Sequence, residues 1–245
     1  MIASLPMYDL PPVMAAHDRL WAGIRVGLAE GPEALTRGVD DLMAQWLSPD
    51  LLLSQTCGMP YRTLLHDRVR LVGTPDFGVE GCAAGYYRSV FVAGIDDARH
   101  DVAQFDKAAL AYNETISQSG WAAPLNHAKT IGIRLRPAVH TEGHRLSLFA
   151  VAEGRAEIAA LDAVSWELFR GYLPAAQMVK VVGMTDPTPG LPYITAPGRD
   201  GGRIFAAIQA AIAAMSATDR AATRLRGIVA IPASAYLAVP NPVAI

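Results

Sequence analysis

Short apolar runs alternate along most of the chain with longer stretches in which hydrophobic residues recur at helical spacing. Runs that are apolar, or rich in β-branched and aromatic residues, predict strands because such side chains suit a pleated and partly buried surface. The expected strands cover residues 2–8, 51–56, 69–77, 86–94, 107–113, 133–140, 156–163 and 179–185.

Helical spacing of apolar residues fills several of the gaps between these runs. The clearest example is 202–216, in which three isoleucines recur every four residues and form one apolar stripe. Earlier helices are expected after Pro11-Pro12 and over 144–154 and 165–173. Gly27 and Gly31 are expected to end the helix that follows the prolines.

Alternating strands and helices predict a mostly parallel sheet with helices on both faces. Ligands bind such sheets beyond the carboxyl ends of the strands, and the polar stretch 117–120 follows the expected strand 107–113. At the start of a helix, unpaired N–H groups and the positive end of the helix dipole favour an anion, and hydroxyls add donors. A simple N-cap by Ser119 would explain the same residues without a ligand.

The composition narrows the class of protein. The 245 residues are 51% hydrophobic and 18% charged, with a net charge of -2 and no block of Lys and Arg, so the basic patch typical of nucleic-acid binders is missing. No apolar run reaches the roughly 18 residues of a membrane-spanning helix. The first residues lack the pattern of a signal peptide, so we expect either a cytoplasmic protein or one whose export signal has been removed.

The two cysteines, Cys57 and Cys82, allow two interpretations. They are two thiols in a reducing compartment, or one disulfide in an exported protein. Neither lies at a recognised zinc-binding spacing from a histidine. The segment HTEGH places His140 and His144 four residues apart, but Gly143 and the preceding strand argue against the helix that a zinc protease needs.

Five stretches come in an order that resembles the phosphonate-binding-like family of ABC-transporter substrate-binding proteins. They are LLLSQTCGMPY, YYRSVFVA, LAYNETISQSGWAAP, EGHRLSLFAVAEGRAEIAALDAVSW and VVGMTDPTPGLPYI. The resemblance covers most of residues 2–197, and it rests on the ordered set because no single motif is diagnostic.

The resemblance implies an α/β fold of type 2 periplasmic binding proteins, with two lobes, two crossing hinge strands and a ligand in the cleft between the lobes. Lobe 1 would comprise 1–86 plus 190–245, and lobe 2 would comprise 87–189. The crossings would fall near Tyr86–Val92 and near Thr185–Ile194. Pro and Gly cluster at the second of these, as a connection without regular structure requires.

The resemblance also implies a binding site for a small oxyanion. In lobe 2, the loop at 117–120 would grip the oxygens of a phosphonate or phosphate, and His144 would face the anion. A charged imidazole beside the anion would tighten binding at lower pH. The full set of expected ligand contacts is Tyr8, Thr56, Cys57, Ser117, Gln118, Ser119, His144 and Asp162.

Asp162 is the acid that would hold the ammonium group of an aminoalkylphosphonate. A second acid is not evident, because Asp186 could be a turn residue. Phosphate, phosphite, other phosphonates or a different small anion therefore stay open as ligands. Trp121 and Trp166 flank the expected site, either as aromatic walls that select a larger ligand or as parts of the core.

The expected function is that of a non-catalytic substrate-binding component, which hands a small anionic ligand to the permease subunits of an ABC transporter. It needs no catalytic residue, metal or cofactor, and no nucleic acid, and the chain would be a monomer or a weak dimer. It would be periplasmic if an export signal has been removed. The alternatives are a stand-alone cytoplasmic ligand sensor and an enzyme of precursor biosynthesis on the same fold.

Overall fold

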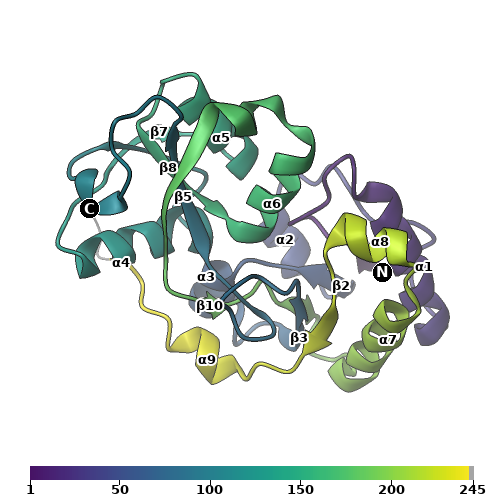
Figure 1. Ribbon diagram of the computed structural model, residues 1–245. Coiled ribbons are helices and arrows are strands. Elements are labelled where there is room, and N and C mark those ends of the chain that lie inside the picture. Colours follow the sequence, from purple (N-terminus) through teal and green to yellow (C-terminus); the bar gives the residue numbers. More distant parts are fainter. Residues whose placement is uncertain (243–245) are drawn as a thin grey trace. The chain divides into compact units, whose positions relative to one another are not determined.

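Two α/β units, each built around a five-stranded sheet, form the computed structural model, which describes residues 1–242 (Figure 1). The first unit comprises Met1–Tyr86 and Pro189–Ala238, and the second is built on Tyr87–Thr188. The chain passes between the units within the strands β4 (Tyr86–Tyr87) and β10 (Thr188–Pro189), which pair with each other.

The C-terminal residues depart from the expected division. Residues 239–242 belong with the second unit, whereas the sequence placed all of 190–245 in the first. A hydrogen bond gives the reason, because Nδ2 of Asn126 in the second unit donates to the carbonyl of Pro240 at 2.8 Å. The chain therefore returns to the second unit after completing the first, and the expectation for this short segment is wrong.

The sheet of the first unit has the strand order β1-β2-β11-β3-β12. Its strands are β1 (Ile2–Ala3), β2 (Leu51–Gln55), β3 (Arg70–Asp76), β11 (Tyr193–Thr195) and β12 (Gly227–Val229). Its helices are α1 (Met14–Leu28), α2 (Leu42–Trp46), α3 (Gly58–Pro60) with the following π-helical turn Tyr61–Leu65, α7 (Gly201–Ala214), α8 (Ala217–Thr223) and α9 (Ala233–Leu237). The expected strand 2–8 is much shorter than predicted, and Pro6 within it has no N–H for a strand ladder.

The second unit has the strand order β7-β6-β8-β5-β9. Its strands are β5 (Ser89–Gly94), β6 (Ala109–Tyr112), β7 (Arg136–His140), β8 (Ile158–Asp162) and β9 (Val179–Met184). Its helices are α4 (Ala123–Thr130), α5 (His144–Ala152) and α6 (Ala163–Tyr172), with the short turns Val102–Gln104, Gln118–Ala122 and Pro174–Met178. Its core includes Phe91, Leu110 and Ile158, which are fully buried.

The prediction of mostly parallel sheets is wrong. In the first unit β11 runs antiparallel to both β2 and β3, and in the second unit β5 runs antiparallel to both β8 and β9. Each of these two strands follows β4 or β10 without an intervening helix and is an interior strand of its sheet. It therefore lacks the crossover helix that makes consecutive strands parallel. Parallel pairing is found between β1 and β2 and between β6 and both β7 and β8, whereas β12 pairs antiparallel to β3.

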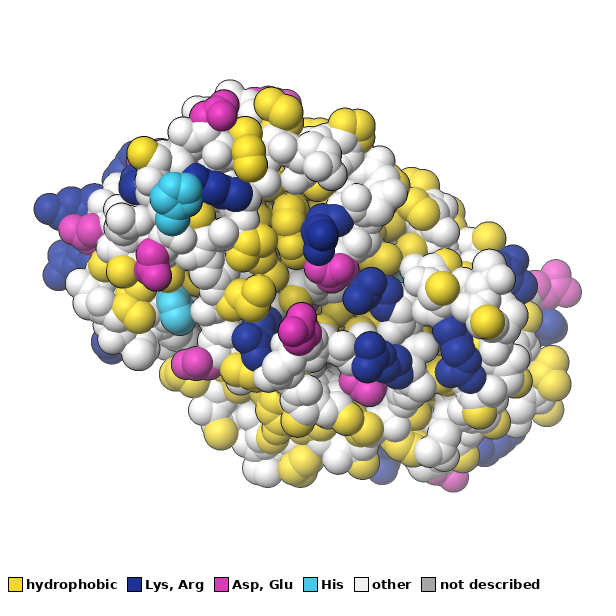
Figure 2. All heavy atoms as spheres, viewed as in Figure 1, with side chains coloured by type: hydrophobic (Ala, Val, Ile, Leu, Met, Phe, Trp, Pro, Cys, Tyr) yellow, Lys and Arg dark blue, Asp and Glu magenta, His cyan; other side chains and the backbone are white. Residues whose placement is uncertain are grey.

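Two surface properties complete the description. No helix between residues 1 and 242 combines the length and the apolar character needed to cross a lipid bilayer. On the face drawn in Figure 2, basic and acidic side chains lie interspersed among hydrophobic and uncharged ones.

Cys57 and Cys82 are not joined by a disulfide, so the structure holds two thiols at these positions.

The packing of α1 against α7 forms much of the first unit's core, and the two helices lie side by side in Figure 1. The predicted stripe of Ile204, Ile208 and Ile212 is confirmed, because all three are buried in the same cluster as Leu20 and Trp21 of α1. The apolar faces that helical spacing predicts thus meet each other.

Gly27 does not end α1, as the sequence suggested, but lies within it. A Cβ at this position would lie 3.3 Å from Cβ of Ala207 in α7, and Gly23 has a similar close contact with Ala211. The two glycines allow the backbones of α1 and α7 to approach closely. The helix ends instead at Ala29, which adopts a left-handed conformation with a φ of 51°.

Replacing Gly27 by leucine is therefore expected to destabilise the protein. The added side chain would push α7 away from α1, and overpacking of this kind costs about 1–3 kcal/mol. The measurement is the free energy of unfolding in urea. Val26→Leu is the matched control, since Val26 is 80% exposed on the same helix and its replacement should leave stability nearly unchanged. Equal effects of the two substitutions would contradict the close packing.

Candidate functional site

Three parallel strands of the second unit end at the same edge of its sheet. β8 and β7 flank β6 and both run parallel to it, and each of the three strands leads into a helical segment. The first helical turns after β6, β7 and β8 consequently start along this edge, where their unpaired N–H groups attract negative charge. The residues that follow the strand ends therefore form the candidate site.

Ser117 begins the segment after β6. It is the N-cap of the π-helical turn Gln118–Ala122, and the Gly120 N–H donates to its Oγ at 3.0 Å. Its backbone is extended, with φ −78° and ψ 134°, as an N-cap requires. Ser117, Gln118 and Ser119 are all buried. The N-cap role of a serine in this stretch is thus real, and it belongs to Ser117, which leaves Ser119 for a different contact.

Ser119 contacts His144, the first residue of α5. Oγ of Ser119 lies 2.8 Å from Nε2 of His144, so the starts of two helical segments are joined by one hydrogen bond. The carbonyl of Ser119 accepts a hydrogen bond from Oγ of Ser89 at 2.9 Å, which ties the same turn to β5. The structure therefore joins Ser119 to His144, and the role of these two residues, Ser117 and Gln118 as ligand contacts stays a prediction.

The imidazole of His144 is neutral at physiological pH. Burial lowers its pKa to about 4, and the backbone of Ala160 opposes this shift only in part. The side chain as a whole is partly exposed, whereas Nδ1 is buried and has no hydrogen-bond partner within residues 1–242. A neutral ring carries one donor and one acceptor nitrogen, so the role of Nε2 towards Ser119 depends on the tautomer.

Gly120 holds the cluster at close range. A Cβ at this position would lie 1.9 Å from Oδ1 of Asn113 and 3.3 Å from Cε1 of His144, so only glycine fits between them. Oδ1 of Asn113 is also buried without a hydrogen-bond partner in the described structure. A buried polar atom that lacks a partner is costly to a folded protein and is typical of a site that is completed by a ligand.

The loop between β7 and α5 is fixed from behind by Thr141. Its Oγ1 donates to the Tyr112 carbonyl at 3.0 Å and lies 2.6 Å from Oγ of Ser147. The Glu142 N–H donates to the carbonyl of Asn113 at 3.1 Å, so the loops after β6 and β7 are bonded to each other. These contacts keep His144 in position beside Ser119.

Asp162 ends β8 and is buried. Its Oδ1 accepts hydrogen bonds from the N–H groups of Val164 at 2.8 Å and Ser165 at 2.9 Å, which makes it the N-cap of α6. One carboxylate oxygen is thus already used by the fold. Its expected role as an ammonium partner stays a prediction, and Asp186 is exposed.

The two tryptophans near the site differ. Trp166 is buried in α6, in agreement with a place in the core. Trp121 is partly exposed, and its ring lies 4.9 Å from the ring of Tyr112 at the end of β6. Of the two tryptophans, Trp121 is therefore the one whose ring is open to contact with a ligand.

The remaining expected contacts lie in the first unit. Tyr8 is buried, with its ring edge-on to Phe77 at 4.9 Å, so it packs on Phe77. Thr56 follows β2 and is fully buried, and its Oγ1 has no hydrogen-bond partner among the described residues. Cys57 precedes α3 as its N-cap residue, with an extended backbone. Their role as ligand contacts stays a prediction.

Sequence reasoning missed Asn113, Ser89 and Thr141. Asn113 stands at the end of an expected strand, and nothing in its neighbours distinguishes it from an ordinary turn asparagine. Ser89 and Thr141 reach the site only through the pairing of strands distant in sequence, which no local pattern reveals. The serine-glycine loop had a recognisable signal because hydroxyls and glycine at a helix start suit an anion.

The pair His140 and His144 does not form a metal site. His140 lies at the end of β7, where its Nε2 is 3.3 Å from the carboxylate of Glu114, whereas His144 bonds to Ser119. Within the described chain, no three His, Cys, Asp or Glu side chains are grouped so that they could hold a metal ion.

Solved structures share the fold at low sequence identity. PhnD1 from Prochlorococcus marinus, in complex with methylphosphonate, has a TM-score of 0.70 at 12% identity, covering 96% of this chain and 94% of that one. A binding protein component of an ABC phosphonate transporter from Pseudomonas aeruginosa has a TM-score of 0.68 at 13% identity, covering 94% and 81%. XAC2383 from Xanthomonas citri, bound to ATP, has a TM-score of 0.63 at 15% identity, covering 96% and 92%.

These likenesses establish the two-lobed fold of periplasmic binding proteins. No curated protein matches the sequence significantly. A family model does match, over residues 54–234, which is more than half of the chain, and it describes the periplasmic substrate-binding protein of phosphonate ABC transporters. This match shows that the chain belongs to the family of phosphonate ABC-transporter substrate-binding proteins.

Proposed function

We propose that the second unit binds the phosphonate or phosphate group of a small ligand at Ser117, Ser119 and His144. The observation that carries the proposal is the contact between Ser119 Oγ and His144 Nε2, which joins the starts of two helical segments. Hydroxyl groups, an imidazole and unpaired N–H groups at one strand edge supply the donors that a tetrahedral oxyanion accepts.

The cluster of Ser117, Ser119 and His144 carries no charge, so hydrogen bonds and not ion pairs would select the ligand. His144 is uncharged at pH 7, because burial lowers its pKa to about 4. Oriented dipoles at helix starts then supply the attraction, which suits an anion that must be released as well as bound. The methylphosphonate bound by PhnD1 of Prochlorococcus marinus supports a small phosphonate as the ligand.

An alkylphosphonate without an amino group fits these residues better than 2-aminoethylphosphonate. Oδ1 of Asp162 is already the cap of α6, and Asp186 is exposed. The buried carboxylate therefore has a structural function that does not depend on an ammonium group. Phosphate and phosphite present the same oxygens without the alkyl group and are the closest competitors to test.

The family assigns the chain a transport function, and we propose the finer details. The chain binds and releases its ligand chemically unchanged, outside the cytoplasm, and delivers it to the permease subunits of an ABC transporter. It acts as a monomer or weak dimer and needs no cofactor or nucleic acid. The neutral donors of the cluster serve binding, and the proposal assigns none of them a catalytic step.

Replacing Ser119 by alanine is expected to weaken methylphosphonate binding by about tenfold or more. The substitution removes one hydrogen-bond donor to an anion, and such a bond is worth about 1.5–3 kcal/mol. Isothermal titration calorimetry measures the affinity. Ser234→Ala, an exposed serine of α9 in the first unit, is the matched control and should bind like the wild type.

The same titrations with phosphate, phosphite and 2-aminoethylphosphonate decide between ligands. If none of the four binds the wild-type protein better than about 1 mM, the proposed ligand class is wrong. If one binds and Ser119→Ala and His144→Gln bind it equally well, the ligand class stands and the placement of the site is wrong.

Binding is expected to take up a proton as the pH falls below neutral. When the Ser119 hydroxyl donates a hydrogen bond to the anion, its Oγ accepts a hydrogen bond from Nε2 of His144, and a protonated imidazole can donate it. The negative charge of the anion also raises the pKa of His144 above its value of about 4 in the ligand-free protein. Affinity should therefore rise as pH falls through the raised pKa, and should level off below about 4.

Calorimetry in buffers of different ionisation enthalpy measures this proton uptake. Methanesulfonate, which stays singly charged over this range, separates titration of the protein from titration of the phosphonate. His144→Gln should abolish the uptake. A pH-independent affinity for methanesulfonate in the wild type would mean that the ring only changes tautomer.

A further inference from the structure

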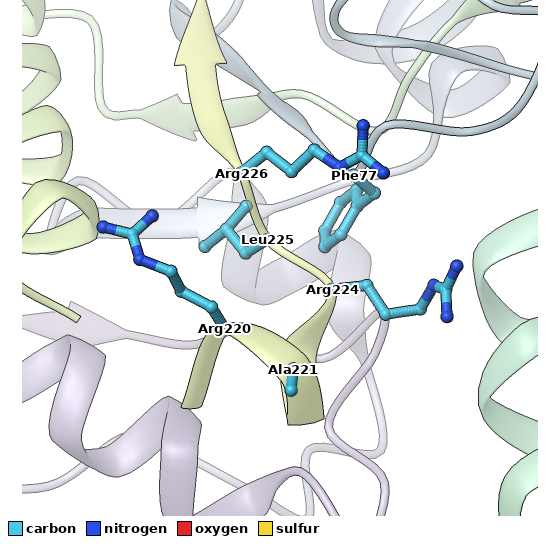
Figure 3. Close-up of a pocket in the computed structure, with 6 residues that line it drawn as sticks. All are labelled: Phe77, Arg220, Ala221, Arg224, Leu225 and Arg226. Carbon is cyan, nitrogen blue, oxygen red and sulfur yellow. The ribbon is translucent and has the colours of Figure 1, made fainter. Parts of the chain in front are cut away.

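A basic cavity of about 400 Å³ lies within the first unit (Figure 3). It is lined by Phe77, Arg220, Ala221, Arg224, Leu225 and Arg226, which come from the end of β3, from α8 and from the start of β12. Three of the six residues are arginines and none is acidic. Its volume falls in the usual range for small-molecule sites, about 300–1,000 Å³.

Figure 3 shows how these side chains lie. Arg224 and Arg226 extend to the same side as the ring of Phe77, one above it and one below it, whereas Arg220 extends the other way. A guanidinium of Arg220 donates to the carbonyl of Ala213 at 2.8 Å, which ties it to the end of α7. Arg224, Arg226 and Phe77 thus line the same side of the cavity.

The backbone at Gly78 and Arg224 helps to shape the cavity. Gly78 has a φ of 59°, and a Cβ there would lie 2.0 Å from Cζ of Arg226, so the guanidinium lies directly over the glycine. Arg224 itself has a φ of 60°, a left-handed conformation that glycine or asparagine usually adopts at the end of a helix. The chain keeps an arginine in this strained conformation, and strain of this kind is typical of functional positions.

The acids near the cavity are engaged elsewhere. Oδ1 of Asp76 accepts hydrogen bonds from the N–H groups of Gly78 and Gly85, and Asp219 of α8 is paired with Arg19. In the part of the chain that the structure describes, the Arg226 guanidinium makes no hydrogen bond or ion pair. The positive charge at this cavity is thus not neutralised by Asp76 or Asp219.

The apolar part of the lining indicates what else the ligand carries. Phe77 is partly exposed and is supported from behind by the buried ring of Tyr8 at 4.9 Å, and Leu225 is buried beside it. A flat apolar group can pack on such a surface while its charged group reaches the guanidinium fork, which binds two oxygens at once. Neither phosphate alone nor a neutral aromatic compound would use both features.

We propose that this cavity is a second binding site, for an organic dianion with a planar apolar body such as an aryl phosphate. It is distinct in chemistry from the second-unit cluster, where neutral hydroxyl and imidazole groups provide the donors.

Phenyl phosphate is the probe, and calorimetry with the full chain is the measurement. Arg226→Gln should weaken phenyl phosphate binding by about tenfold or more, since it removes a charge-assisted hydrogen bond. Phe77→Leu keeps an apolar side chain but loses the ring and should weaken phenyl phosphate binding more than inorganic phosphate binding. Arg68→Gln, an exposed arginine elsewhere in the first unit, is the control and should bind like the wild type.

The variants of the two sites separate this proposal from the function proposed above. Ser119→Ala should weaken methylphosphonate binding and leave phenyl phosphate binding at the cavity unchanged, whereas Arg226→Gln should do the reverse. Phenyl phosphate binding that is lost in Ser119→Ala and kept in Arg226→Gln would overturn the second site. So would wild-type binding weaker than about 1 mM, or equal affinities for phenyl phosphate and inorganic phosphate.

Discussion

The parallel pairing of β6 with β7 and β8 is the constraint on which the second-unit site depends. Parallel strands end at the same edge of the sheet, and each of these three is followed by a helical segment that starts there. Ser117, His144 and Asp162 each stand at the beginning of one of these segments. If the strands were antiparallel, their following residues would lie at opposite edges, and Ser119 could not reach His144.

At three positions, glycine is needed because another group lies very close to the backbone, more than because the chain turns there. Gly27 lets α1 contact Ala207, Gly120 makes room for Asn113 and His144, and Gly78 lies under the guanidinium of Arg226. At each position the missing side chain lets another group occupy the space beside the backbone. The first glycine serves the core, and the other two serve candidate binding sites.

The part of the fold that follows from local pattern was predictable. Most strand and helix positions, the isoleucine stripe of α7 and the cap at 117–120 depend on residues adjacent in sequence, and the structure reproduces them. The direction of β5 and β11 was not predictable from periodicity, because it depends on where the chain crosses between the units. Asn113 and Ser89 were missed for a related reason, since their contacts join strands that are distant in sequence.

The two candidate sites would bind an anion in two ways that differ in their sensitivity to dissolved salt. At Ser119 and His144, neutral groups and helix dipoles act at short range, where dissolved salt screens them little. At Arg224 and Arg226, exposed full charges act through water, and salt at physiological concentration screens them beyond about 8 Å. The first arrangement suits selective capture at any ionic strength, because orientation of donors decides what fits. The second suits attraction of a doubly charged compound, and it needs the Phe77 ring to distinguish that compound from the inorganic anions that compete for the same charges.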